Sequence, residues 1–168
     1  GKDFLIAGFE VYLIDFGMAF YPSEALERKV VFALGFSPPE LILNQLHLAN
    51  QASDIFALGI SIYFLYAGNL PLTHPNPAVM TNLQITHPLQ ANSNVPKVIF
   101  KLIERMCFKE SFKKPAHLLT QKEVESILQK GIQARPQDLG EVIKILQNNL
   151  AKKEKSFFWK LIKISSNS

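Results

Sequence analysis

The stretch Val11-Tyr12-Leu13-Ile14-Asp15-Phe16-Gly17 is the most informative part of this chain. Its first four residues favour a β-strand, which would deliver Asp15 onto a Phe-Gly turn. A carboxylate held at the end of a strand, with glycine freeing the next peptide, suits a magnesium ion that bridges nucleotide phosphates. A turn aspartate that caps its own backbone is the plainer interpretation of the same residues.

Two later stretches follow in a fixed order, Ser37-Pro38-Pro39-Glu40 and then Ala52-Ser53-Asp54-Ile55-Phe56-Ala57-Leu58-Gly59. Together with Asp15-Phe16-Gly17 they resemble the C-terminal lobe of the protein kinase family, from the end of the catalytic loop onward. The resemblance covers most of residues 1–150. It implies a mainly α fold with a small β-hairpin, which is the larger lobe of the α+β kinase fold.

Several kinase motifs do not occur in this chain: the glycine-rich phosphate loop, a Val-Ala-Ile-Lys-like strand and His-Arg-Asp. The resemblance therefore implies that the N-lobe, the ATP lysine and the catalytic aspartate are absent from this sequence. No catalytic residue is assigned within the chain, which we expect to be inactive on its own.

The resemblance assigns nucleotide and metal binding to the start of the chain. It implies that Asp15, with Phe16 and Gly17, binds the magnesium of Mg²⁺-ATP. Asp3 stands where the family usually carries an asparagine that holds a second magnesium ion. An aspartate also ligates a hard cation through oxygen, and the plainer interpretation of Asp3 is a solvated terminal acid.

Glu40 resembles the family glutamate that forms a structural ion pair with a distant arginine. Arg135 is the first choice for its partner, because a guanidinium matches a carboxylate with two parallel hydrogen bonds. Lys114 also fits the family pattern, and the sequence leaves both open. Asp54 resembles the family aspartate that accepts hydrogen bonds from the catalytic-loop backbone, although the helix dipole alone also favours an acid there.

The periodicity of the chain predicts a body made mostly of helices. Ser53 is the expected N-cap of a helix from Asp54 to Ala67 that ends at Gly68 and is apolar on every side, which favours a central position. Short strands are expected at 4–6 and 11–14. Further helices are expected at Leu41–Leu46, Val79–Ile85, Lys97–Phe108, from the Thr120 capping box to Lys130, and at Asp138–Leu150.

The net charge of +4 at pH 7 lies in the last part of the 168 residues. Residues 151–168 hold five lysines and one glutamate, which leaves residues 1–150 with 13 basic and 13 acidic side chains. The neutral body indicates no nucleic-acid partner. The basic aromatic tail at 151–168 is either a frayed helix packed on the lobe or a weak contact with an anionic membrane surface or a partner.

Cys107 is the only cysteine and lies in a helical apolar pattern, which indicates a buried, reduced thiol in a cytoplasmic protein. No apolar stretch is long enough to span a membrane. Ala33 stands where active serine/threonine kinases usually carry a threonine.

Two functions follow from these observations. The first is a partial serine/threonine kinase domain that needs its N-lobe or a partner chain to transfer the ATP γ-phosphoryl group to a protein substrate. The second, favoured by Ala33 and Asp3, is a degenerate kinase-like lobe that acts as a protein-binding or regulatory module.

Overall fold

The computed structural model describes residue 19 and residues 32–148 of the chain. Both expected strands, at 4–6 and 11–14, fall outside these residues, and so does the tail at 151–168. The described part is mainly α, as the sequence predicts, and contains no strand.

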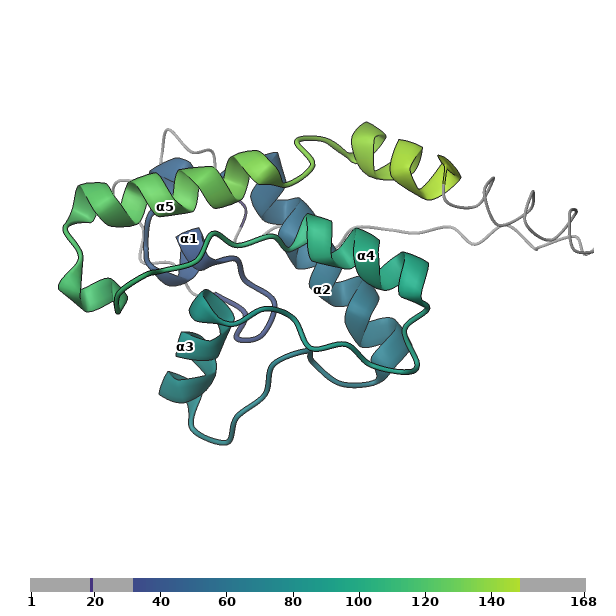
Figure 1. Ribbon diagram of the computed structural model, residues 1–168, viewed down its shortest axis with the longest axis horizontal. Helices are drawn as coiled ribbons and strands as arrows, with labels where there is room; N and C mark the ends of the chain where they lie inside the picture. The colour runs from purple at the N-terminus through teal and green to yellow at the C-terminus, as the bar shows by residue number, and fades with distance from the viewer. Residues whose placement is uncertain (1–18, 20–31, 149–168) are drawn as a thin grey trace, which may run out of the picture.

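The first helices are separated by short connections, whereas longer segments join α2 to α3, α3 to α4 and α4 to α5 (Figure 1). In chain order they are α1 (Pro39–Ile42), the 3₁₀ turn η3 (Leu46–Leu48), α2 (Gln51–Ala67), α3 (Pro77–Thr86), α4 (Lys97–Met106), the 3₁₀ turn η4 (Ala116–Leu118) and α5 (Gln121–Ala134). Residues 139–148 are also helical.

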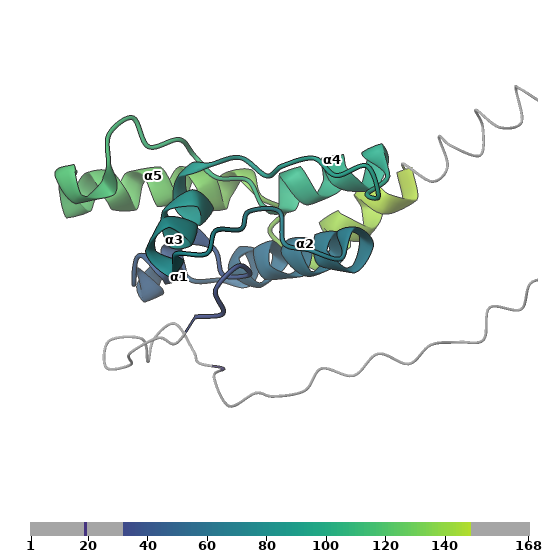
Figure 2. The same cartoon turned by 90° about the horizontal axis from the view of Figure 1, so that it is seen from below.

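The core forms where α2 and α4 lie side by side, as Figures 1 and 2 both show. Burying these apolar side chains supplies most of the driving force for packing the two helices. Gly59 sets how closely they approach, because a Cβ atom built there would lie 2.6 Å from the sulfur of Cys107. The buried core residues are Ile55, Phe56, Ile60, Tyr63, Val95, Leu102, Ile103, Met106, Cys107 and Val142.

Helix α2 begins three residues earlier than the sequence predicts, and its N-cap is Asn50 rather than Ser53. The Asn50 side chain accepts a hydrogen bond from the backbone N–H of Ala52 at 2.9 Å. Ser53 is instead the third helical residue, and its hydroxyl accepts from the Asn50 N–H at 3.3 Å. The prediction of Ser53 as N-cap was wrong because this reciprocal capping box satisfies the free N–H groups one turn earlier. The predicted end at Gly68 is confirmed by its left-handed backbone, with φ of 74°.

The first short helix also begins earlier than expected. The sequence predicts Leu41–Leu46, whereas α1 starts at Pro39 and ends at Ile42. Proline is favoured in a first helical turn, since its missing N–H needs no partner there. Asn44 then adopts a positive φ of 55°, which ends the regular helix before the separate η3 turn.

The remaining helices match their predicted positions with longer or shorter ends. The Thr120 capping box is present, but α5 continues to Ala134, beyond the expected end at Lys130. Gly131 lets the backbone of Glu110 approach the helix, because a Cβ built at Gly131 would lie 3.2 Å from its nitrogen. Helix α4 ends at Met106 and α3 extends from Pro77 to Thr86.

Only one side of α2 is covered by the described residues. Helices α4 and α5 contact it, and the segment at 139–148 adds Val142 to the shared core. Four large apolar residues of α2 remain exposed: Leu58, Phe64, Leu65 and Tyr66. Leu65 is the most open, with 81% of its surface accessible. The central, enclosed position predicted for this helix is therefore not reached within the described part of the chain.

Candidate functional site

The predicted site residues divide into two groups. Asp3, Asp15, Phe16 and Gly17, which the sequence assigns to nucleotide and magnesium, lie outside the described residues. Glu40, Asp54 and Arg135 lie within them, as does the alternative partner Lys114. The site that the structure describes is therefore the one around Glu40.

Glu40 and Arg135 form a buried ion pair with two hydrogen bonds. Arg135 Nη1 donates to Glu40 Oε1 at 2.6 Å, and Nη2 donates to Oε2 at 3.1 Å. The side chains are 0% and 1% exposed, respectively. Two parallel hydrogen bonds are the arrangement that a planar guanidinium makes with a carboxylate, and they orient the pair as well as neutralise it.

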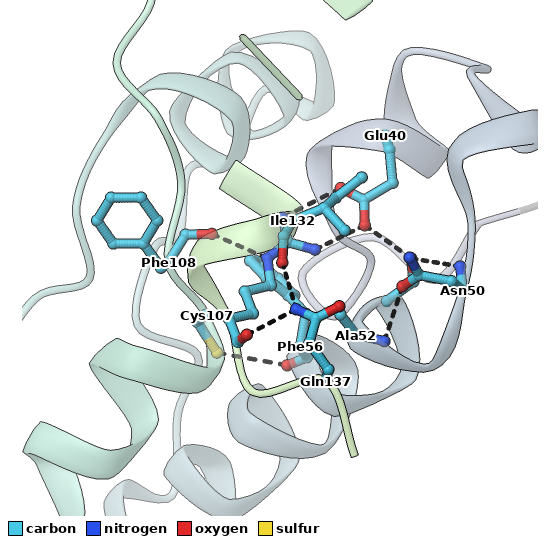
Figure 3. Close-up of polar contacts among 10 residues, drawn as sticks. Glu40, Asn50, Ala52, Phe56, Cys107, Phe108, Ile132 and Gln137 are labelled. Atoms are coloured by element: carbon cyan, nitrogen blue, oxygen red, sulfur yellow. Dashed lines mark hydrogen bonds and ion pairs between the residues drawn. The ribbon is translucent and has the colours of Figure 1, made fainter. Parts of the chain in front are cut away.

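The carboxylate of Glu40 has a third partner on α2. The hydroxyl of Ser53 donates to Glu40 Oε1 at 2.8 Å in a buried contact. Because Ser53 is also part of the capping box with Asn50, the start of α2 is tied directly to α1 (Figure 3). This explains why a polar serine is buried at this position, since a buried hydroxyl needs a hydrogen-bond partner.

Arg135 reaches two further elements. Its Nε donates to the backbone oxygen of Phe108 at 2.9 Å, just after α4, and its guanidinium lies 4.9 Å above the ring centroid of Phe56 on α2. Backbone oxygen atoms of Ile132 and Arg135 accept from the Gln137 amide, at 2.9 and 2.7 Å (Figure 3). The ion pair thus joins α1, α2, the end of α4 and the end of α5 at one buried point.

The chemistry of this site is structural rather than catalytic. Both carboxylate oxygens of Glu40 accept charge-assisted hydrogen bonds, so the group is not free to act as a general base. Attraction and hydrogen bonds within the intact pair offset the cost of burying its two charges, whereas losing one partner leaves the other charge buried and unpaired. We therefore assign the pair the role of anchoring α1, and the segment before it, to the helical body.

Lys114 does not pair with Glu40. It is exposed on the segment between α4 and α5, and no carboxylate of the described residues lies within 4.0 Å of its ammonium group. Of the two partners that the sequence leaves open, the structure brings Arg135 to Glu40. The segment from Lys114 to Arg135, which contains α5, then lies between the two positions that fit the family pattern.

Asp54 lies in the first turn of α2 and is exposed. Partial desolvation by the neighbouring protein raises the pKa of its carboxyl above the usual value. Its position agrees with the favourable placement of an acid at a helix N-terminus. No hydrogen bond to this carboxylate comes from the described residues, and the backbone that the family resemblance assigns to it is not among them.

Cys107 is a buried free thiol, as the sequence predicts. Its Sγ donates to the backbone oxygen of Phe56 at 3.3 Å, and burial raises the pKa of the thiol to about 12. A thiol that stays protonated at neutral pH is a poor nucleophile, so Cys107 is a packing residue of the α2–α4 contact.

Lys109 makes contacts that no sequence pattern predicts. Its ammonium donates to the backbone oxygens of Gln84, at 2.7 Å, and of His87, both near the end of α3. Burial lowers the pKa of Lys109 to about 8. No local sequence pattern indicates these two hydrogen bonds, because each joins Lys109 to a main-chain oxygen more than twenty positions away.

No cluster of three or more metal-binding side chains occurs among residues 32–148. The helices within the same residues include none that is long and apolar enough to cross a membrane.

The helical body and its buried glutamate–arginine ion pair define an α-helical domain in which α1 is tied to α2 and to the ends of α4 and α5. Residues 3–150 match the protein kinase domain family, and the chain belongs to that family. A curated relative is Aurora kinase B of Mus musculus, which is 26% identical over 97 residues. That alignment covers 58% of this chain and 28% of the mouse protein, so the chain matches little more than a quarter of that relative's length.

Proposed function

We propose that this chain is the C-terminal lobe of a serine/threonine protein kinase domain. In its whole form the protein would transfer the ATP γ-phosphoryl group to serine or threonine hydroxyls of a protein substrate. The main support for the proposal is the ion pair between Glu40 and Arg135, which has two hydrogen bonds. It lies where the family resemblance predicts a structural glutamate–arginine pair. The family match over residues 3–150 and the similarity to a kinase of mouse support the same assignment.

In this proposal Asp15 ligates the magnesium ion of Mg²⁺-ATP, with Phe16 and Gly17 shaping the turn that presents it. Asp3 is the proposed ligand of a second magnesium ion. Magnesium would neutralise the charge that develops on the transferring phosphoryl group. The anchor at Glu40 would hold in place the segment that joins Asp15 to α1, which positions the substrate in the proposed enzyme.

We further propose that additional polypeptide covers the exposed face of α2 in the working protein. Leu58 and Leu65 lie seven residues apart, on the same face of the helix, and both are exposed in the described part. Exposed apolar patches of this kind mark surfaces that another segment covers. The lysine and the catalytic aspartate that phosphoryl transfer requires would come with that polypeptide, either the N-lobe or a partner chain. We also propose a cytoplasmic location, which would suit an ATP-dependent activity and a free thiol at Cys107.

A degenerate lobe that serves as a binding or regulatory module is the second proposal. It is favoured by Ala33, which has no hydroxyl at the position where the family usually carries a threonine. Its backbone oxygen accepts from Phe36 and Ser37 at 3.0 and 3.1 Å, so the residue here supports a turn. Such a protein would keep the buried Glu40–Arg135 ion pair but would not catalyse phosphoryl transfer.

Phosphoryl transfer by the gene product purified from its source cells separates the two proposals. The protein would be incubated with magnesium, γ-labelled ATP and a mixed protein substrate, beside an Asp15→Asn variant. Label on serine and threonine that the variant fails to transfer supports the kinase. Absence of transfer from the unmodified product, with a normal melting transition, favours the binding module.

A further inference from the structure

A surface depression of about 440 Å³ lies between the segment that follows α4 and the exposed side of α5. Lys113 and Lys114 contribute to it from the segment. Lys122 and Lys130 contribute from α5, where a spacing of eight residues places them on one face. Four of the basic side chains of the described residues therefore gather around a single hollow, although residues 1–150 are neutral overall.

None of these four ammonium groups forms an ion pair with a described residue. Among residues 32–148, none of them has a carboxylate oxygen within 4.0 Å. The two arginines of the same residues are both paired, Arg105 with Glu141 and Arg135 with Glu40. The hollow is therefore a local concentration of positive charge that the described part of the chain balances only in part.

The two glutamates that line the hollow are used within their own segments. Glu123 accepts hydrogen bonds from the backbone N–H and the hydroxyl of Thr120, each at 2.8 Å, as part of the capping box. Those two bonds, the backbone bond foremost, lower the pKa of its carboxyl, and the positive charge of Lys114 lowers it further. Glu110 accepts from the backbone N–H of Ser111 at 3.3 Å. Four lysines and two glutamates leave the lining with an excess of two positive charges.

Between the lysines the lining is apolar. Leu119 and Ile127 are partly buried there, and the stems of the lysines add further hydrocarbon. A volume of about 440 Å³ falls in the range of pockets that seat a side chain or a small ligand. No aromatic residue lines the hollow, so the stacking surface that single-stranded nucleic acids use is missing from this lining.

We propose that this lysine-lined hollow binds an acidic segment of a partner protein. An apolar side chain of that segment would rest against Leu119 and Ile127, while its flanking carboxylates pair with the surrounding lysines. The concave shape favours a peptide over a membrane, since a lipid surface is met by a convex or flat apolar face. Charge complementarity of this kind sets specificity and association rate more than it sets affinity.

Fluorescence anisotropy on the full 168-residue chain tests the proposal. The probe is a labelled peptide of about 12 residues, rich in aspartate and glutamate around a central leucine. We expect saturable binding that weakens as salt is added, because the contacts are exposed charges. A Lys122→Glu/Lys130→Glu variant should bind at least about tenfold more weakly, which corresponds to about 1.4 kcal/mol.

The matched control is Lys97→Glu/Lys101→Glu, which makes the same change of charge at two exposed lysines of α4. The control should retain the affinity of the unmodified chain, and both variants should keep its circular dichroism spectrum. Equal loss in the two variants would overturn the proposal, because binding would then follow net charge alone. Failure of the unmodified chain to bind the peptide, or preferential binding to phosphatidylserine vesicles, would also overturn it. So would equal affinity for a peptide whose leucine is replaced by glycine.

Discussion

Arg135 donates a hydrogen bond to each carboxylate oxygen of Glu40, although the two residues are 95 positions apart in the sequence. Both side chains are almost completely buried. The contact joins the beginning of the described helical body to the end of α5. A pair of this kind contributes little net stability over well-packed apolar residues, but it specifies which segments meet. The main role of the pair is thus to fix the position of the segment before α1.

Replacing Arg135 by alanine should lower the free energy of unfolding by about 3 to 5 kcal/mol. The reason is that Glu40 would remain buried without its cation, and only the Ser53 hydroxyl would still donate to it from a side chain among the described residues. Urea denaturation of the two proteins measures the difference. A loss of less than about 0.5 kcal/mol would contradict the assigned role of the pair.

The matched control is Arg105→Ala, because Arg105 forms a pair of the same 2.6 Å length with Glu141. That pair is half exposed, and water screens it. Its loss should cost at most about 1 kcal/mol. Similar losses of unfolding free energy in the two variants would show that burial does not determine how much the Glu40–Arg135 pair matters for stability.

Gly59→Ala should destabilise the chain by about 1 to 3 kcal/mol. The added methyl group would lie 2.6 Å from Cys107 Sγ and 3.0 Å from Met106 Cβ, so α2 and α4 would have to separate. Thermal unfolding measures the effect. Adding Cys107→Ala should recover part of the loss, since it removes the closest atom; purely additive costs would count against this packing.

Lys109 should make stability depend on pH above neutrality. Below about pH 8 its ammonium group is charged in both states, and burying that charge costs stability in the folded chain. Between about pH 8 and the ordinary value of 10.5, the folded chain releases this proton before the unfolded chain does. The unfolded state then binds more protons, so this contribution to stability rises with pH, by up to about 3 kcal/mol.

Lys109→Met should remove that rise, whereas Lys101→Met, at an exposed lysine of α4, should keep it. The measurement is the free energy of unfolding of each variant at about pH 7.5 and about pH 10. Cys107 acts in the opposite direction, because its thiol stays protonated only in the folded chain, but it is common to all three proteins. An unchanged pH dependence in Lys109→Met would contradict the buried-ammonium account.

Helix starts and ends that depend on neighbouring residues could be predicted from the sequence. The capping box at Thr120 and Glu123 is a short-range pattern, and α5 begins where it predicts. Gly68 similarly marks the end of α2. The start of α2 was wrong because Ser53 fits an N-cap equally well by type, and only the contact with Glu40 shows that it has another partner.

Contacts between residues far apart in the chain could not be predicted from the sequence. Arg135 and Lys114 both fit the partner of Glu40, and only the folded path of α5 brings the guanidinium to it. The carbonyl contacts of Lys109 and the lysine-lined hollow have no sequence signature, because both arise where separate segments meet. Asp3 and Asp15 remain predictions, as they lie outside the described residues.

Binding of Mg²⁺-ATP tests the proposed kinase function most directly, because it needs no knowledge of the protein substrate. The melting temperature of the gene product purified from its source cells would be measured with and without Mg²⁺-ATP, beside an Asp15→Ala variant. The account predicts a rise that the variant abolishes, since a ligand that binds only the folded state stabilises it. No rise in the unmodified protein, or an equal rise in the variant, would contradict the assignment of Asp15 to the nucleotide's metal.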